Sequence, residues 1–160
     1  MLKIRWAVAE DVPLILGMVR ELAEYEHLVD TLRVSAEDLL RDGWGEEPKF
    51  RCVIAEWERE AAGYALFFHN YSTFRGRPGL YLEDVFVRPS YRGRGIGRGL
   101  LTHVAQIAVR EQCARFEWQV LDWNTPAIDF YKSVGAVELS DWRTMRVQGD
   151  ALQLLADGDR

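Results

Sequence analysis

Cysteine and histidine are scarce in this sequence of 160 residues, which contains two cysteines and three histidines. Cys52 and Cys113 lie far apart and outside any C-x-x-C spacing, so the sequence predicts neither a disulfide framework nor a zinc knuckle. His27, His69 and His103 are scattered, with no spacing that places two on one helix face. We therefore predict no bound metal and interpret both thiols as buried and inert.

Long apolar runs and an excess of basic charge are also lacking. No segment approaches the roughly 18 continuous apolar residues of a membrane span, and the first residues lack the apolar stretch of a secretory signal. With 20 basic and 25 acidic residues, the formal net charge is -5, which argues against a general nucleic-acid binder. These absences predict a cytoplasmic protein without membrane or nucleic-acid partners, and its field suits a small cationic substrate.

The length and the 48% hydrophobic content predict a single α/β domain over residues 1–160. Alternating and helical periodicities give the order βααβββαβαβ, a mixed central β-sheet with flanking helices. The predicted strands are 2–7, 50–57, 63–69, 80–87, 115–121 and 142–147. The predicted helices are 12–23, 35–40, 96–108 and 125–133.

The most informative motif is a glycine-rich turn from Arg92 to Arg98, between a predicted strand and a predicted helix. Backbone N–H groups at a helix start have no intrahelical partner, and the helix dipole favours an anion there. The turn therefore predicts a phosphate cradle, to which Arg92, Arg94 and Arg98 would add charge. It matches neither the dinucleotide motif nor the P-loop. The alternative is a plain flexible turn with solvated arginines.

This turn and the preceding Val85-Phe86-Val87 resemble the acetyl-CoA signature R/Q-x-x-G-x-G/A of the GNAT N-acetyltransferases. Arg92, Gly95 and Gly97 match its fixed positions. The resemblance implies a GNAT fold, with the strand backbone holding the pantetheine arm and the turn amides holding the pyrophosphate of acetyl-CoA. The residues assigned to acetyl-CoA are Val85, Phe86, Val87, Arg92, Gly93, Arg94, Gly95, Ile96, Gly97, Arg98 and Asn124.

The similarity extends to the spermidine/spermine (diamine) and thialysine acetyltransferases. It is carried by four segments, residues 21–26, 38–43, 81–87 and 122–126. The resemblance implies a homodimeric enzyme that transfers acetyl from acetyl-CoA to a primary amine. The implied acceptor is a small diamine, polyamine or lysine-like amino acid, and the amine attacks directly in a ternary complex.

Two residues carry the chemistry that such a transfer requires. An alkylammonium has a pKa of about 10.4, so its proton must be taken up or relayed. The resemblance assigns Glu83 to bind the acceptor amine and to pass its proton on through water. The departing thiolate needs an acid, and the resemblance assigns Tyr131. The alternatives are a solvated edge carboxylate at Glu83 and a packing tyrosine at Tyr131. Asp84 is expected on the opposite strand face from Glu83.

Binding of the acceptor's second charged group is assigned to Tyr25 and Glu26, in the acidic stretch that begins at Glu21. A solvated helix face is the alternative reading of these charges. Glu24 replaces a lysine of the polyamine enzymes, and the connection from Leu139 to Trp142 carries fewer acids than theirs. The sequence therefore favours short acceptors over spermine.

Two other functions remain open. One is an acetyltransferase for protein lysines or N-termini, and the other is a noncatalytic module that senses acyl-CoA. Turnover with peptides would indicate the first, and tight cofactor binding without turnover of any amine would indicate the second.

Overall fold

The computed structural model describes residues 1–158, in two compact units that are treated separately: residues 1–124 and residues 125–158. The strands are β1 (Leu2–Trp6), β2 (Arg51–Trp57), β3 (Glu60–Ser72), β4 (Arg77–Val87) and β5 (Phe116–Trp118). The helices of the first unit are α1 (Val12–Tyr25), α2 (Ala36–Trp44) and α3 (Ile96–Arg110). The second unit contains α4 (Thr125–Ser133) and α5 (Asp150–Asp157).

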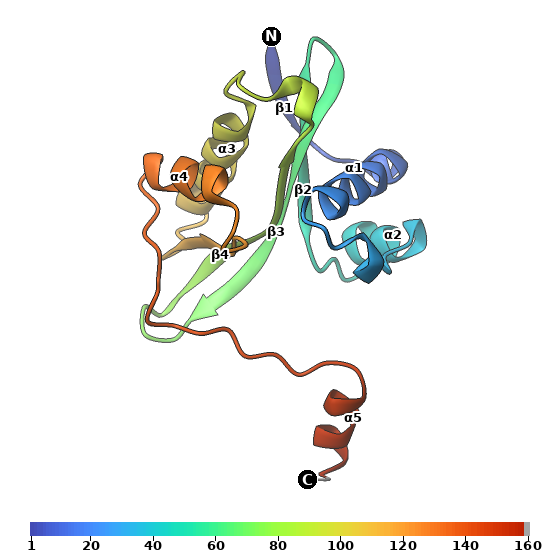
Figure 1. Cartoon of the computed structure of the whole chain (residues 1–160), viewed down its shortest axis with the longest axis vertical. Helices are drawn as coiled ribbons and strands as arrows, with labels where there is room; N and C mark the ends of the chain where they lie inside the picture. Colours follow the sequence, from blue (N-terminus) through green and yellow to red (C-terminus); the bar gives the residue numbers. More distant parts are fainter. Residues whose placement is uncertain (159–160) are drawn as a thin grey trace. The chain divides into compact units, whose positions relative to one another are not determined.

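The five strands form one mixed sheet in the order β1-β2-β3-β4-β5. The pairs β1-β2, β2-β3 and β3-β4 are antiparallel, and β5 is parallel to β4. Helices α1 and α2 cover one face of the sheet and α3 covers the other (Figure 1). The predicted mixed α/β sheet with flanking helices is therefore confirmed.

Each face of the sheet has its own hydrophobic core. The core beneath α1 and α2 includes Val12, Ile15, Met18, Leu39, Cys52, Ile54, Tyr64, Leu66 and Phe86. On the other face, α3 buries the predicted stripe of Ile96, Leu100, Leu101, Val104, Ile107 and Ala108. Burying each large aliphatic side chain contributes about 1.5–3 kcal/mol, so these two stripes fix which faces of the helices meet the sheet.

A β-bulge interrupts the pairing of β3 with β4. The register steps from Phe67 opposite Leu82 to Leu66 opposite Asp84, which leaves Glu83 as an extra residue in β4. Leu66 belongs to the core beneath α1, whereas its neighbour Phe67 faces α3 because side chains alternate. Leu82 therefore faces α3, and the bulge turns Asp84 towards α1.

The structure departs from the predicted elements near the C-terminus. The predicted strand 142–147 does not form, and Trp142 and Met145 are exposed. Alternation specifies only which face a strand would bury, whereas a strand also needs a ladder partner, and no ladder among residues 1–158 includes this segment. The helix α5 was not predicted, and β5 is shorter than the predicted strand 115–121.

Helix α2 also runs further than predicted, because Asp42 and Gly43 do not end it. A side chain at Gly43 would meet the Phe50 ring at 2.8 Å, so this glycine serves a close contact rather than a turn. Within residues 1–158, no helix has both the length and the apolar character needed to cross a membrane.

Candidate active site

The C-terminal end of α1 meets the glycine-rich turn and the residue that precedes α4. Tyr25 is the last residue of α1, and its hydroxyl donates a hydrogen bond of 3.4 Å to Oδ1 of Asn124. The guanidinium carbon of Arg92 lies 4.7 Å from the centre of the Tyr25 ring and 5.8 Å from that of Phe86. Arg92 Nε also donates to the carbonyl of Val87 at 3.0 Å. The fold thus gathers five predicted site residues.

These contacts bear on two predicted roles. The sequence assigns the Arg92 charge to phosphate and the Tyr25 ring to the acceptor's second cation, but the structure places Arg92 on Tyr25. A second cation at this ring would be repelled by the guanidinium, so carboxylates are the better partners for it. The guanidinium of Arg94 lies 5.5 Å from the Trp57 ring and 5.6 Å from the Tyr91 ring. Phosphate binding by these arginines stays a prediction.

The glycine-rich turn has the backbone geometry of an anion site. Gly93 and Gly95 have φ of 75° and 77°, a left-handed conformation that residues with a side chain rarely adopt. Gly95 caps α3, and the N–H of Gly99 donates to its carbonyl at 2.9 Å. The amides of residues 96–98 therefore precede the helical ladder at the positive end of the α3 dipole. This arrangement fits a phosphate group.

The edge of β4 next to this turn is open. Among residues 1–158, β5 pairs with β4 only from Leu80 to Leu82, whereas residues 84–87 pair with β3 on their other side. Backbone groups on such an edge can pair with an extended ligand. A side chain at Gly63 would lie 2.3 Å from the Phe86 carbonyl, so this glycine permits the close approach of β3. Edge and turn together fit the arm and pyrophosphate of acetyl-CoA.

Asp84 on β4 is affected by the charges of two other carboxylates, Glu83 and Glu26. Burial raises the pKa of Asp84 to about 6, the charges of Glu83 and Glu26 also raise it, and a hydrogen bond from Tyr64 Oη at 3.0 Å opposes the rise. Burial likewise raises the pKa of Glu26. Glu83 is exposed. A cationic amine bound here would relieve the repulsion between these groups, so the arrangement suits an ammonium-bearing acceptor.

Asp84 is a candidate site residue that was not predicted from the sequence. The available signal was the pair Glu83-Asp84 inside an otherwise apolar strand. Burial and the contact with Tyr64 could not be read from it, because the bulge that directs Asp84 towards α1 depends on the register with β3.

Tyr131 lies on α4 in the second unit and is partly exposed. Its carbonyl accepts hydrogen bonds from the N–H groups of Val134 at 3.2 Å and Ala136 at 3.0 Å. Gly135, with φ of 94°, makes this helix end possible. The backbone of Tyr131 is thus held in a defined helix terminus, and the acid role of its phenol stays a prediction.

Comparisons with known proteins agree with this geometry. The model of the acetyltransferase (GNAT) family matches residues 17–136. Thialysine N-epsilon-acetyltransferase of Sus scrofa is 44% identical over 164 residues, covering 96% of each chain. Spermidine/spermine N(1)-acetyltransferase-like protein 1 of Homo sapiens is 38% identical over 94% of this chain and 23% of its own. An integron cassette protein from the mobile metagenome of V.cholerae superposes with a TM-score of 0.82 at 28% identity, covering 97% of each chain.

Proposed function

The chain belongs to the GNAT acetyltransferase family, and from this premise we propose that it transfers acetyl from acetyl-CoA to a primary amine of a small diamine, polyamine or lysine-like amino acid. The observation that carries the proposal is that a phosphate-compatible turn, an open strand edge and a group of carboxylates adjoin in one unit. The family match crosses the boundary between the two units, which supports one domain over residues 1–160.

In this proposal, acetyl-CoA supplies the acetyl thioester, and the backbone supplies its site. The amides of residues 96–98 would bind the pyrophosphate, with Gly93 and Gly95 shaping the turn. The edge of Val85 to Val87 would bind the pantetheine arm by strand-like hydrogen bonds.

Glu83 and Tyr131 would move the protons. The acceptor ammonium loses a proton to Glu83 through water, and the free amine attacks the acetyl carbonyl. A C–N bond forms as the C–S bond breaks, the Tyr131 hydroxyl donates a proton to the departing sulfur, and the nitrogen releases its remaining extra proton to solvent to give the neutral amide. Solvent then takes the proton from Glu83 and returns one to Tyr131, so each residue transfers one proton per turnover.

The acceptor's second charged group would lie near Glu26 and Asp84. Both carboxylates are withdrawn from solvent, and each has a raised pKa that a bound cation would lower. The relative from Sus scrofa is named for thialysine, a lysine-like amino acid. Short acceptors with a second polar or cationic group are therefore the proposed substrates.

The cofactor assignment predicts that acetyl-CoA raises the melting temperature of the protein. A ligand at 100 times its dissociation constant adds about 2.7 kcal/mol to the stability of the native state. NAD and ATP should stabilise much less. In calorimetric titration, Gly95→Ala is expected to weaken acetyl-CoA binding at least tenfold. Gly76→Ala is a matched control, since Gly76 also has positive φ (63°) in open space. Equal stabilisation by all three nucleotides would contradict the assignment.

The acceptor assignment predicts a ranking of kcat/KM across a panel of amines. Putrescine, thialysine and lysine should exceed a simple alkylamine at least tenfold, because carboxylates attract a second cation, and should also exceed spermine. Thiol release at one salt concentration measures this. An alkylamine that matched the best diamine would remove the acidic second site. Turnover of peptides alone would indicate a protein acetyltransferase, and acetyl-CoA binding without any turnover would indicate a sensor.

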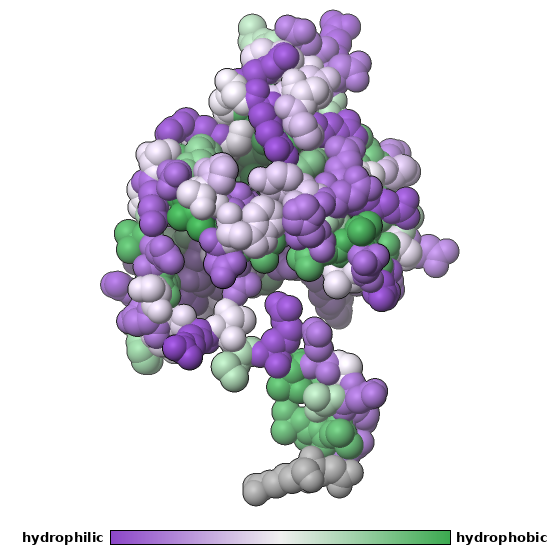
Figure 2. Space-filling model, in the orientation of Figure 1, coloured by the Kyte–Doolittle hydropathy of each residue, from purple (hydrophilic) through white to green (hydrophobic). Residues whose placement is uncertain are grey.

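The proposal includes a homodimer, which the exposed hydrophobic side chains of the second unit support. The exposed hydrophobic side chains of α5 form an apolar surface (Figure 2). Four more exposed hydrophobic residues precede α5 in the chain: Val137, Leu139, Trp142 and Met145. Contiguous apolar surface of this kind marks an interaction site, and twofold pairing is the default for identical chains. Light scattering should give twice the mass of 18.5 kDa; a monomer mass at micromolar concentration would refute the dimer.

A cytoplasmic location stays a prediction from the sequence.

A further inference from the structure

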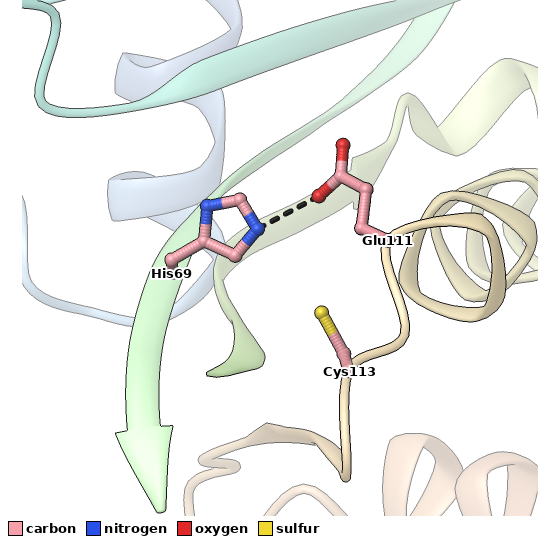
Figure 3. A group of neighbouring side chains, drawn as sticks. All are labelled: His69, Glu111 and Cys113. Atoms are coloured by element: carbon pink, nitrogen blue, oxygen red, sulfur yellow. Dashed lines mark hydrogen bonds and ion pairs between the residues drawn. The ribbon is translucent and has the colours of Figure 1, made fainter. Parts of the chain in front are cut away.

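Three side chains with metal-binding atoms gather at the C-terminal end of α3. They are His69 from β3, Glu111 directly after α3, and Cys113 two residues further on (Figure 3). One ligand atom from each lies within 4.8 Å of the others. His69 Nε2 is 2.7 Å from Oε2 of Glu111. The sequence predicted no bound metal, because these three residues lie too far apart in the chain to show a metal-ligand spacing.

The backbone holds this cluster on rigid elements. The N–H of Cys113 donates to the Ala108 carbonyl at 2.9 Å, and the N–H of Gln112 donates to that of Val109 at 3.1 Å. With Gln112 at φ of 56°, these bonds form a Schellman helix end. Glu111 and Cys113 are thereby fixed to α3, while His69 is fixed to the 13-residue strand β3. Ligands on such elements are pre-positioned for binding.

The cluster is not arranged as a nucleophilic site. Burial, and then the charge of Glu111, raises the pKa of the Cys113 thiol, whereas a reactive cysteine needs a lowered one. Cys113 is nevertheless only partly buried, so the expectation of a fully buried thiol was wrong for this residue. A thiol with this pKa stays protonated unless a metal ion displaces its proton.

Glu111 is charged and firmly placed. Arg51 donates to both of its carboxylate oxygens, from Nη1 to Oε1 at 2.6 Å and from Nη2 to Oε2 at 2.9 Å. The pKa of Glu111 is lowered chiefly by this hydrogen bonding to Arg51. The guanidinium would remain on Oε1 and orient the carboxylate while Oε2 faces the cluster.

We propose that His69, Glu111 and Cys113 bind one zinc ion. Thiolate sulfur, imidazole nitrogen and carboxylate oxygen are the ligand types of Zn²⁺, and water would complete a tetrahedron. Calcium and magnesium prefer oxygen ligands alone and do not suit this set. On binding, the thiol proton passes to solvent and the neutral imidazole presents its Nε2 lone pair to the metal.

The zinc site is separate from the proposed active site. The glycine-rich turn precedes α3, and the cluster follows it, so the 15 residues of the helix separate them by about 22 Å. Zinc would tie the end of α3 to β3 across the sheet face. The role proposed for zinc is structural, and this proposal does not depend on the identity of the acetyl acceptor.

The test uses the full-length protein after treatment with a chelator. Titration with Zn²⁺ should show one saturable site, and Co²⁺ as a probe should give a thiolate-to-cobalt charge-transfer band. Cys113→Ser should abolish the band, and His69→Gln and Glu111→Gln should each weaken Zn²⁺ binding at least tenfold. Melting temperatures without metal confirm that each variant is folded.

Two controls separate ligand loss from disturbance of the surface. Arg51→Gln breaks the ion pair with Glu111 but removes no ligand, so the cobalt band should persist. His103→Gln removes a histidine of α3 that lies outside the cluster, and this variant should bind Zn²⁺ like the unaltered chain. A cobalt band that persists in Cys113→Ser, or Zn²⁺ affinity unchanged in His69→Gln or Glu111→Gln, would overturn the proposal.

Discussion

Replacement of Tyr131 by phenylalanine is expected to lower kcat by about 100-fold, the lower range of general acid catalysis. The substitution removes only the hydroxyl, which the proposed mechanism needs when the thiolate departs. The affinity for acetyl-CoA should change by less than about twofold, because the ring and the helix end around Gly135 remain. Steady-state kinetics with the best amine of the panel and calorimetry with acetyl-CoA measure the two quantities.

Tyr71→Phe is the matched control, because Tyr71 is an exposed tyrosine of β3 outside the candidate site. Its kcat should equal that of the unaltered chain. If Tyr131→Phe also turns over at the unaltered rate, the acid lies elsewhere. If it loses acetyl-CoA affinity in proportion to rate, Tyr131 contributes binding rather than proton transfer.

Replacement of Glu83 by glutamine is expected to lower the amine-dependent rate by about 100-fold with cofactor affinity preserved. The amide cannot accept the ammonium proton, so only the small fraction of free amine can react near neutral pH. Raising the pH should therefore recover part of the lost rate, because it increases that fraction. Measuring kcat/KM from pH 7 to 10 tests both the loss and the recovery.

Glu58→Gln, at the turn between β2 and β3, serves as the control for the lost charge. Asp84→Asn should instead raise the KM of the acceptor, because Asp84 is proposed to bind a cation rather than to take a proton. The pKa of Asp84 is about 6, so this contribution should be present above pH 6 and fade as the pH falls below it. A rate in Glu83→Gln equal to that of the unaltered chain at every pH would assign proton removal to another group.

The features that the sequence predicted well are local. Helical stripes such as 96–108 are visible because packing on one side imposes a period of 3.6 residues. The glycine-rich turn is visible because Gly93 and Gly95 must adopt a left-handed backbone, which few other residues tolerate. Both signals are contained within a few consecutive residues, so no knowledge of the fold is needed to find them.

The features that escaped prediction join distant parts of the chain. The contact of Tyr25 with Asn124 spans 99 positions, and that of His69 with Glu111 spans 42. Periodicity cannot say whether a segment such as 142–147 will find a strand to pair with, because the partner's availability is decided elsewhere. The environment of Asp84 escaped for the same reason, since it depends on the register between two strands.

The extra residue in β4, Glu83, places a carboxylate at a position that neither hydrophobic core has to fill. Leu82 and Asp84 would face opposite sides of the sheet even if Glu83 were absent, so both cores keep their full set of side chains. Glu83 is thus an insertion between two packing positions, and its identity is free of volume constraints from either core. The pairing with β5 ends at the residue just before it, and a bulge bends the strand that carries it. A chain shortened by this one residue would have the more regular sheet, and it would lose the carboxylate together with the bend beside the open edge.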